Sequence, residues 1–229
     1  MNATLTFNSR PSVRARACVA GPKEGQGPMA KYFDRVLADD LVGQESWELA
    51  EGEMLKQTIE LCLQKGGLPS DGAEVMLTGD LLNQLMPSGL AARGLGAPFF
   101  GLYGACSTAI EALALGGALV DGGYRKNAVC GASSHFCTAE RQFRFPLELG
   151  NQRPPSAQWT ATAAGAMLLD ANKDKSAVCL THATIGRVID YQITDANHMG
   201  AAMAPAVIDT LQSHFADTNR SFADYDLIA

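Results

Sequence analysis

A cysteine at the start of an apolar run is the feature of this sequence that most restricts its fold. Residues 107–120 carry almost no polar side chain and end at Asp121-Gly122-Gly123, which predicts a helix over Gly104 to Val120. Cys106 then lies where unpaired amides and the helix dipole favour a thiolate, and small neighbours leave room for a ligand. Cys106 is therefore a candidate nucleophile. The alternative is a buried, inert core cysteine, which is the commoner state of a free thiol.

The rest of the chain alternates short apolar strands with helical patterns. The helix that we expect over Ser46 to Lys65 ends at Gly66-Gly67, and the expected strands are Val13 to Gly21, Val75 to Thr78 and Asn127 to Ala132. This alternation predicts an α/β protein with a mainly parallel sheet covered by helices.

Charge and cysteine usage exclude several classes of partner. The formal net charge is −6 and no basic tail occurs, so nucleic acid is not an expected partner. The six cysteines are widely spaced in mostly apolar runs, which favours reduced thiols in a reducing compartment. We find no signal peptide and no apolar run long enough for a transmembrane helix. The expected location is therefore cytoplasmic, or peripheral on a membrane through a partner.

A weak internal repeat suggests two related halves. Met54 to Glu60 parallels Met203 to Asp209, and Glu74 to Leu77 parallels Asp226 to Ala229. We therefore expect a first half over residues 1–175 and the start of a second over 176–229, ending within a strand. A fragment or truncated gene product is the expectation, because such a strand would leave an open edge; a short domain with a genuine edge strand is the alternative.

The cysteine, the apolar helix after it, Gly122-Gly123 and the strand Ala128-Val-Cys-Gly-Ala132 resemble the thiolase and condensing-enzyme superfamily. That resemblance implies a thiolase-like fold, in which a βαβαβαββ unit occurs twice and the nucleophilic cysteine caps a buried central helix. The second copy would be incomplete here. Such enzymes complete their site with histidine from the second half, and neither His182 nor His198 lies at that position.

A closer resemblance, covering the whole chain, is to the stage V sporulation protein AD family of endospore-forming bacteria. It implies a protein that binds dipicolinic acid (pyridine-2,6-dicarboxylate), alone or as the calcium chelate. It also implies that the protein supports uptake of this ligand into the developing spore with membrane-embedded proteins of the same operon, as a homodimer on the spore inner membrane. The motifs that carry it are Pro22-Lys-Glu-Gly-Gln-Gly-Pro28, Ser46-Trp47-Glu48, Gly79-Asp80-Leu81-Leu82-Asn83-Gln84, Gly101-Leu-Tyr-Gly-Ala-Cys-Ser107, Ser133-Ser134-His135, Glu140-Arg-Gln-Phe-Arg-Phe-Pro146 and Gln158-Trp-Thr160.

A dicarboxylate needs charge-assisted donors, and arginines follow the strand that ends near Ala132. Arg141 and Arg144 are the preferred ligand residues, ahead of Arg153; the alternative is that they pair with Glu140 and Glu148 in structural salt bridges. Neutral donors at the end of that strand complete the expected site, where ligands of α/β sheets tend to bind. The predicted ligand-binding residues are Cys106, Ser133, Ser134, His135, Arg141 and Arg144.

Three functions are therefore open. The first is non-catalytic dipicolinate binding on a thiolase scaffold, with no required cofactor. The second is an acyltransferase in which Cys106 takes an acyl group from a coenzyme A thioester, and the third is a structural subunit that keeps the fold for its dimer interface. No protein-bound metal is expected, since His135 and Cys137 lack a nearby second ligand pair and no Asp-rich calcium loop occurs.

Overall fold

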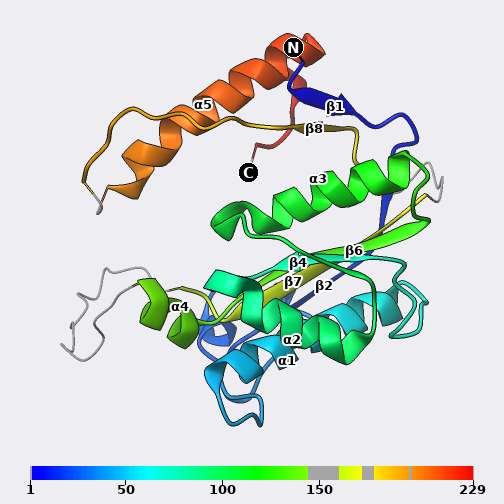
Figure 1. The fold of residues 1–229 in the computed structure, drawn as a ribbon, viewed down its shortest axis with the longest axis vertical. Coiled ribbons are helices and arrows are strands. Elements are labelled where there is room, and N and C mark those ends of the chain that lie inside the picture. The colour runs from blue at the N-terminus through cyan, green and yellow to red at the C-terminus, as the bar shows by residue number, and fades with distance from the viewer. Residues whose placement is uncertain (1, 144–159, 172–177, 196–197, 229) are drawn as a thin grey trace. The chain divides into compact units, whose positions relative to one another are not determined.

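The computed structural model describes residues 2–143, 160–171, 178–195 and 198–228 (Figure 1). The chain forms two compact units. One comprises Ser9–Cys179, and the other combines Met1–Asn8 with Leu180–Ala229. The first holds all the residues of the predicted ligand site.

The larger unit is built on a six-stranded sheet. Five of its strands run in one direction, and β7 alone runs antiparallel to its neighbours β2 and β6. The predicted α/β class and mainly parallel sheet are thus confirmed. The order across the sheet is β3 (Arg35–Val36), β2 (Ser12–Ala20), β7 (Ala163–Asp170), β6 (Asn127–Ser134), β4 (Met76–Gly79) and β5 (Phe99–Gly101).

Helices α1 (Trp47–Lys65) and α2 (Met86–Leu95) cover one face of this sheet, and α3 (Thr108–Asp121) lies on the other (Figure 1). The predicted bounds of α1 are confirmed: the Ser46 side chain caps it by accepting a bond from the Leu49 amide (3.3 Å). Buried residues of α1 pack against the sheet and form the core, including Met54, Leu55, Ile59, Leu63, Val129 and Leu168.

A glycine lets α3 approach the sheet closely. A Cβ added at Gly116 would lie 2.5 Å from Cys130 Sγ on β6, so only glycine fits there without a shift. The Cys130 thiol also donates to the Ala112 carbonyl of α3 (3.2 Å). The helix begins at Thr108, after a 3-10 turn η4 (Ala105–Ser107), so the predicted helical segment divides into a turn and a helix.

Short elements complete the larger unit. Helix α4 (Phe136–Phe143) follows β6 almost directly. The glycine- and proline-rich segment Pro22 to Pro28 contains the turn η1 (Glu24–Gln26), and η2 (Ala30–Tyr32) and η3 (Asn83–Leu85) are further 3-10 turns.

The smaller unit pairs the chain's N-terminal segment with its C-terminal part. Strand β1 (Thr4–Thr6) runs antiparallel to β8 (His182–Thr184), and α5 (Met199–Thr218) and η6 (Phe222–Asp224) follow. The Asp217 carboxylate of α5 accepts bonds from the Ala3 and Thr4 amides, at 2.8 and 2.9 Å. The strand expected at the chain's end is wrong for residues 226–228, because they pair with no strand among the described residues, whose two-stranded sheet joins β1 to β8. The second half that we expect from residue 176 onward begins outside the described residues, which resume at Val178.

The boundary that we expect at residue 175 separates two copies of an internal repeat. The two compact units are a different division of the chain, so this boundary stays a prediction. The grouping of the first eight residues with the C-terminal segment was not expected, because nothing in the sequence of β1 alone indicates its distant partner strand.

Candidate functional site

The parallel strands place four chain segments at one edge of the sheet. Strands β2, β4, β5 and β6 run in one direction, so their carboxyl ends meet there. We call this the carboxyl edge. It brings together the segments that hold Glu24, Asp80, Cys106 and Ser134, and ligands of open α/β sheets bind at such an edge.

Cys106 lies in the turn η4 that joins β5 to α3, and it is exposed. The turn is held by Ser107 Oγ, which donates to the Gly104 carbonyl (2.7 Å), and by the Gly104 amide, which donates to Thr108 Oγ1 (3.1 Å). Ala105 adopts φ 46°, a left-handed conformation that costs energy for a residue with a side chain. In the described part of the chain Cys106 has no hydrogen-bond partner, and its side chain is exposed.

The other cysteines include true core thiols. Cys62 and Cys130 are buried, and burial raises the pKa of the Cys62 thiol to about 11 and that of Cys130 to about 12. All six cysteines are free in this structure, and the reduced state expected from their spacing stays a prediction.

A chain of hydrogen bonds links three segments of the carboxyl edge. Tyr103, three residues before Cys106, donates its hydroxyl to Asn83 Oδ1 (3.0 Å), and the Asn83 amide donates to Gln142 Oε1 of α4 (3.1 Å). Tyr103 is half exposed. Gln84 and Leu85, which follow Asn83 in the chain, both adopt positive φ angles. The loop after β4 is therefore fixed against the loop that carries the thiol.

Beneath this edge lies a buried carboxyl group that the sequence analysis missed. Glu51 of α1 is 1% exposed and accepts bonds from Ser133 Oγ (3.0 Å) and Thr138 Oγ1 (2.8 Å). Burial, reinforced by the negative charge of Asp80, raises the pKa of Glu51 to about 7, although the two hydroxyl bonds oppose the shift. The signal in the sequence was that Glu51 is a charged residue on the apolar face of the predicted helix, which indicates a buried carboxyl group.

Asp80, directly after β4, is a second buried carboxylate. It is 1% exposed and accepts from the Leu82 amide (2.9 Å), the Ser88 amide (2.8 Å) and Ser88 Oγ (2.6 Å). These bonds fix the loop that follows β4 to the first turn of α2. Asp80 thus fixes the conformation of this loop at the carboxyl edge.

The side chains of the predicted donors Ser133, Ser134 and His135 are all hydrogen-bonded to other groups of the protein. Ser133 is bonded to Glu51, and Ser134 Oγ donates to the Ala161 carbonyl (2.6 Å). His135 is 1% exposed, its Nε2 lies 2.9 Å from the Asp40 carbonyl oxygen, and its Nδ1 accepts from the Cys137 amide (3.2 Å).

These contacts define the state of His135. An accepting Nδ1 requires the proton on Nε2, which then donates to Asp40. Burial lowers the pKa of His135, and its ring packs beside Trp47 and Phe136, with both centroid distances 5.3 Å. The ring is therefore a neutral part of the packing beneath the edge.

The predicted arginines cannot be placed in the same way. Arg141 belongs to α4, but its side chain is outside what the structure describes, and Arg144 and Arg153 lie outside the described residues. Their role as ligand residues stays a prediction. Cys106 and the serines are brought to one edge, as the strand order requires.

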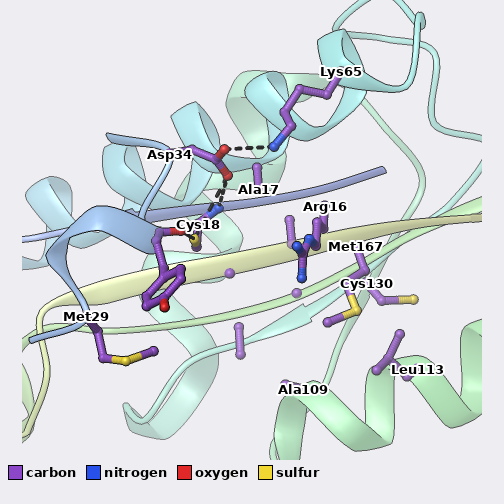
Figure 2. A pocket seen from close by; sticks show the side chains of 15 residues that line it. Arg16, Ala17, Cys18, Met29, Asp34, Lys65, Ala109, Leu113, Cys130 and Met167 are labelled. Atoms are coloured by element: carbon purple, nitrogen blue, oxygen red, sulfur yellow. Dashed lines mark hydrogen bonds and ion pairs between the residues drawn. The ribbon is translucent and has the colours of Figure 1, made fainter. Parts of the chain in front are cut away.

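A cavity of about 610 Å³ lies on the α3 side of the sheet (Figure 2). We call it the sheet-face pocket. It was not predicted, because its walls come from strands far apart in the sequence. Its lining residues include Ala109 and Leu113 of α3, Cys130 and Ala132 of β6, Gly165 and Met167 of β7, Arg16 and Cys18 of β2, and Met29, Tyr32, Asp34 and Lys65.

Two negative findings concern the described residues only. No three His, Cys, Asp or Glu side chains among them gather closely enough to hold a metal ion. None of the helices in the described ranges combines the length and apolarity needed to span a bilayer.

Solved structures identify the class of fold. A cysteine-to-serine variant of OleA of Xanthomonas campestris, crystallised with bound lauric acid and lauroyl-CoA, superposes with a TM-score of 0.67 over 96% of this chain and 77% of that chain, at 11% identity. The 3-oxoacyl-(acyl carrier protein) synthase III FabH of Xanthomonas oryzae gives a TM-score of 0.63 over 97% of this chain and 77% of that chain, at 12% identity. The fold is therefore that of the thiolase-like condensing enzymes, as expected.

Within that class, sequence comparison identifies the family. The model of the stage V sporulation protein AD family matches residues 1–229, and the chain belongs to this family of sporulation proteins. The stage V sporulation protein AD of Bacillus subtilis (strain 168) is 44% identical over 225 residues, which cover 98% of this chain and 66% of that protein. The chain thus spans slightly less than two thirds of the length of this relative.

Proposed function

We propose that this sporulation protein binds dipicolinic acid at the carboxyl edge and supports its uptake into the developing spore without catalysing a reaction. Membership of the stage V sporulation protein AD family is the observation that carries the proposal. Dipicolinate is a planar dianion, so its site must supply hydrogen-bond donors and a surface for the ring. Both kinds of group occur near Cys106.

The loop after β5 supports this proposal locally. Tyr103 presents a half-exposed ring, and Cys106 an exposed thiol, on the same loop at the carboxyl edge. The amide groups of Asn83 and Gln142 accept bonds through their oxygens, which leaves their NH₂ groups as donors toward a carboxylate. Arg141, in the same helix as Gln142, is the nearest charged donor in sequence to the predicted Ser133–His135 segment.

Calcium would enter as part of the ligand, coordinated by dipicolinate itself. The partners in this proposal are membrane-embedded proteins of the same operon, with the protein as a homodimer on the spore inner membrane. Sedimentation at the mass of two chains would support the dimer, and sedimentation at 24.2 kDa would contradict it.

Calorimetric titration with dipicolinate, with and without calcium, tests the binding. Saturable heat is expected, and Tyr103→Phe and Cys106→Ser should weaken it because both residues are on the proposed binding loop. Cys179→Ser is the matched control, since Cys179 lies outside the carboxyl edge, beside Arg10 (3.2 Å). A folded protein that gives no heat with either form of the ligand would reject the proposal.

An acyltransferase is the second candidate, favoured by the exposed Cys106 and by the fold shared with OleA, a protein crystallised with lauroyl-CoA. In that reaction the Cys106 thiolate attacks the thioester carbonyl, the new S–acyl bond replaces the bond to coenzyme A, and the released coenzyme A thiolate takes up the proton that Cys106 lost. Intact-mass measurement after incubation with an acyl-CoA distinguishes the candidates. A mass increase of one acyl group in the wild type, absent from Cys106→Ser, supports catalysis, and an unchanged mass supports binding alone.

A further inference from the structure

One hydroxyl group beneath the carboxyl edge lies between two hydrogen-bond acceptors. Thr138 Oγ1 is 2.8 Å from Glu51 Oε2 and 2.9 Å from the carbonyl oxygen of His135. A threonine hydroxyl carries a single proton, so it can donate to only one of these two oxygens at a time. Both distances are typical of O–H···O bonds, and two oxygens at this separation repel each other unless a proton lies between them. The geometry therefore requires a second proton in this group of atoms.

Only the carboxyl group of Glu51 can carry that second proton. A carbonyl oxygen has none, and the other oxygen of Glu51, Oε1, accepts from Ser133 Oγ (3.0 Å). With the proton on Oε2, the acid donates to Thr138, and Thr138 donates to the His135 carbonyl. Each of these contacts is then a hydrogen bond. Burial favours the same state, since Glu51 is 1% exposed and burial raises its pKa to about 7.

Ionisation of Glu51 changes this arrangement. The carboxylate can only accept, so both hydroxyls donate to it and Thr138 gives up its bond to the His135 carbonyl. That carbonyl also accepts from the Ala139 amide (3.0 Å), which is the first backbone bond of α4. The first turn of α4 therefore has two hydrogen-bond arrangements, one for each charge state of Glu51.

The same carboxyl group is connected to both segments that hold predicted ligand residues. On β6, the predicted donor Ser133 is bonded directly to Glu51. On α4, the helix that Thr138 begins also carries Arg141 and Gln142. Gln142 Oε1 accepts from the Asn83 amide in the loop after β4 (3.1 Å). A change at the first turn of α4 therefore acts on the carboxyl edge itself.

Asp80 is the neighbouring charge that acts on Glu51. It accepts three hydrogen bonds, and its negative charge contributes to the raised pKa of Glu51. Burial lowers the pKa of His135, so that ring is neutral near pH 7. Glu140 follows Thr138 by two positions and therefore lies on the opposite side of α4. Strands β2, β6 and β7 contribute apolar side chains to the core beneath α1. The titratable residues of α1 beside Glu51 and of the segments packed against it are Asp40, Glu48, Glu53, Asp80, Arg93, His135, Cys137, Glu140 and Arg141.

We propose that Glu51 is a protonation switch for the first turn of α4, and that dipicolinate binds more tightly at the carboxyl edge when Glu51 is neutral. The neutral acid pairs every group of that turn, and it leaves one negative charge fewer beneath a dianionic ligand. By linkage, dipicolinate binding then draws a proton onto Glu51. The effect on the ligand rests on the dipicolinate binding proposed above, whereas the switch itself is a property of the protein without ligand.

NMR of the unaltered protein without ligand tests the switch. The carbon-13 shift of the Glu51 carboxyl group should titrate with a midpoint near pH 7, and the backbone amides of residues 136–139 should shift with the same midpoint. Thr138→Val keeps the shape of the side chain without the hydroxyl, so it should largely abolish these amide shifts. The matched control is Thr58→Val, which removes a buried hydroxyl bonded to the Met54 carbonyl on α1 (2.8 Å) and should leave them unchanged.

Calorimetric titration with dipicolinate at pH 6 and pH 8 tests the effect on the ligand. The wild type should bind at least about threefold more weakly at pH 8, where Glu51 is ionised, whereas the ligand's carboxylates are charged at both pH values. Glu51→Gln should bind at both pH values as tightly as the wild type does at pH 6, since its amide donates to Thr138 and accepts from Ser133 like the neutral acid. Glu53→Gln makes the same change at a side chain bonded to Gln57 (3.0 Å), and should keep the wild-type pH dependence.

A Glu51 carboxyl group that titrates near its ordinary value of 4.5, or amides of residues 136–139 that do not respond to its ionisation, would overturn the switch. Equal affinity of the wild type for dipicolinate at pH 6 and pH 8, or a wild-type pH dependence in Glu51→Gln, would overturn its effect on the ligand. If Glu51 titrates near pH 7 and moves the α4 amides while dipicolinate gives no heat at either pH, the switch is supported and the proposed function is rejected. The two can therefore fail separately.

Discussion

Ser133, at the end of β6, donates its hydroxyl to Glu51 of α1 over 3.0 Å, and this bond ties the helix layer to the sheet directly beneath the carboxyl edge. Thr138 of α4 donates to the other carboxyl oxygen of Glu51 over 2.8 Å. One buried carboxyl group thus connects three elements. Because that group changes charge near neutral pH, the connection has a measurable pH dependence.

Glu51→Gln should remove a pH-dependent part of stability. The pKa of Glu51 is about 7 in the folded protein against an ordinary 4.5, so the folded state binds more protons between these values and stability falls as pH rises. The shift corresponds to about 3 kcal/mol lost between pH 4.5 and pH values above 7. Urea denaturation of wild type and Glu51→Gln at pH 5 and pH 8, followed by tryptophan fluorescence, measures the difference.

The wild type should lose more stability from pH 5 to pH 8 than the Gln variant, and at pH 8 the variant should be at least as stable. Ser133→Ala is a useful companion, because it removes one hydroxyl that stabilises the carboxylate and should raise the pKa of Glu51 further. Equal pH profiles of the wild type and Glu51→Gln would show that Glu51 titrates at its ordinary value.

Cysteine reactivity should follow burial. Iodoacetamide should modify Cys106 first, because its thiol is exposed. Cys62 and Cys130 should react only after unfolding, since burial both blocks access and raises their pKa values to about 11 and about 12. Peptide mass mapping over time gives the order. The fast adduct should be absent from Cys106→Ser, and early modification of Cys62 or Cys130 would contradict the burial found here.

Asp80→Ala should loosen the loop between β4 and α2. The substitution removes the acceptor for two backbone amides and the Ser88 hydroxyl, and leaving buried donors unpaired costs about 1–3 kcal/mol for each group. Asp80→Asn keeps one oxygen acceptor and should cost less. We expect faster hydrogen exchange at the amides of Leu82 and Ser88 in Asp80→Ala. Unchanged exchange at both amides would show that other contacts fix the loop.

The local signals of the sequence predicted the main elements well. Ser46 and Gly66-Gly67 mark the ends of α1, and the apolar segments around Val75 and Asn127 are strands. Such signals depend on neighbouring residues alone. The pairing of β1 with β8 depends on residues about 180 positions apart, and no local pattern could reveal it.

The candidate site likewise combines features that local sequence patterns predicted with features that depend on long-range pairing. The common edge that Cys106 shares with Ser134 follows from a parallel sheet, which the alternation of strands and helices indicated. The exposure of Cys106 was one of two alternatives that the sequence left open. The sheet-face pocket depends on the register of β2, β7 and β6, which brings Arg16 into line with Met167 and Cys130. Register is a property of the assembled sheet, so the pocket could not be derived from the sequence.

The close contact between α3 and β6 gives a last prediction. Gly116→Ala would place a methyl group 2.5 Å from Cys130 Sγ, so the helix must shift and the protein should lose about 1–3 kcal/mol of stability, reduced by about 1 kcal/mol of helix propensity. Gly89→Ala in α2 is the control: its added methyl group meets open space, so it should stabilise the protein slightly. Cys130→Ala removes the sulfur, so Gly116→Ala should cost less in that background. Urea denaturation of the two single variants and the double variant measures this coupling, and strictly additive losses would show that α3 does not rest on Cys130.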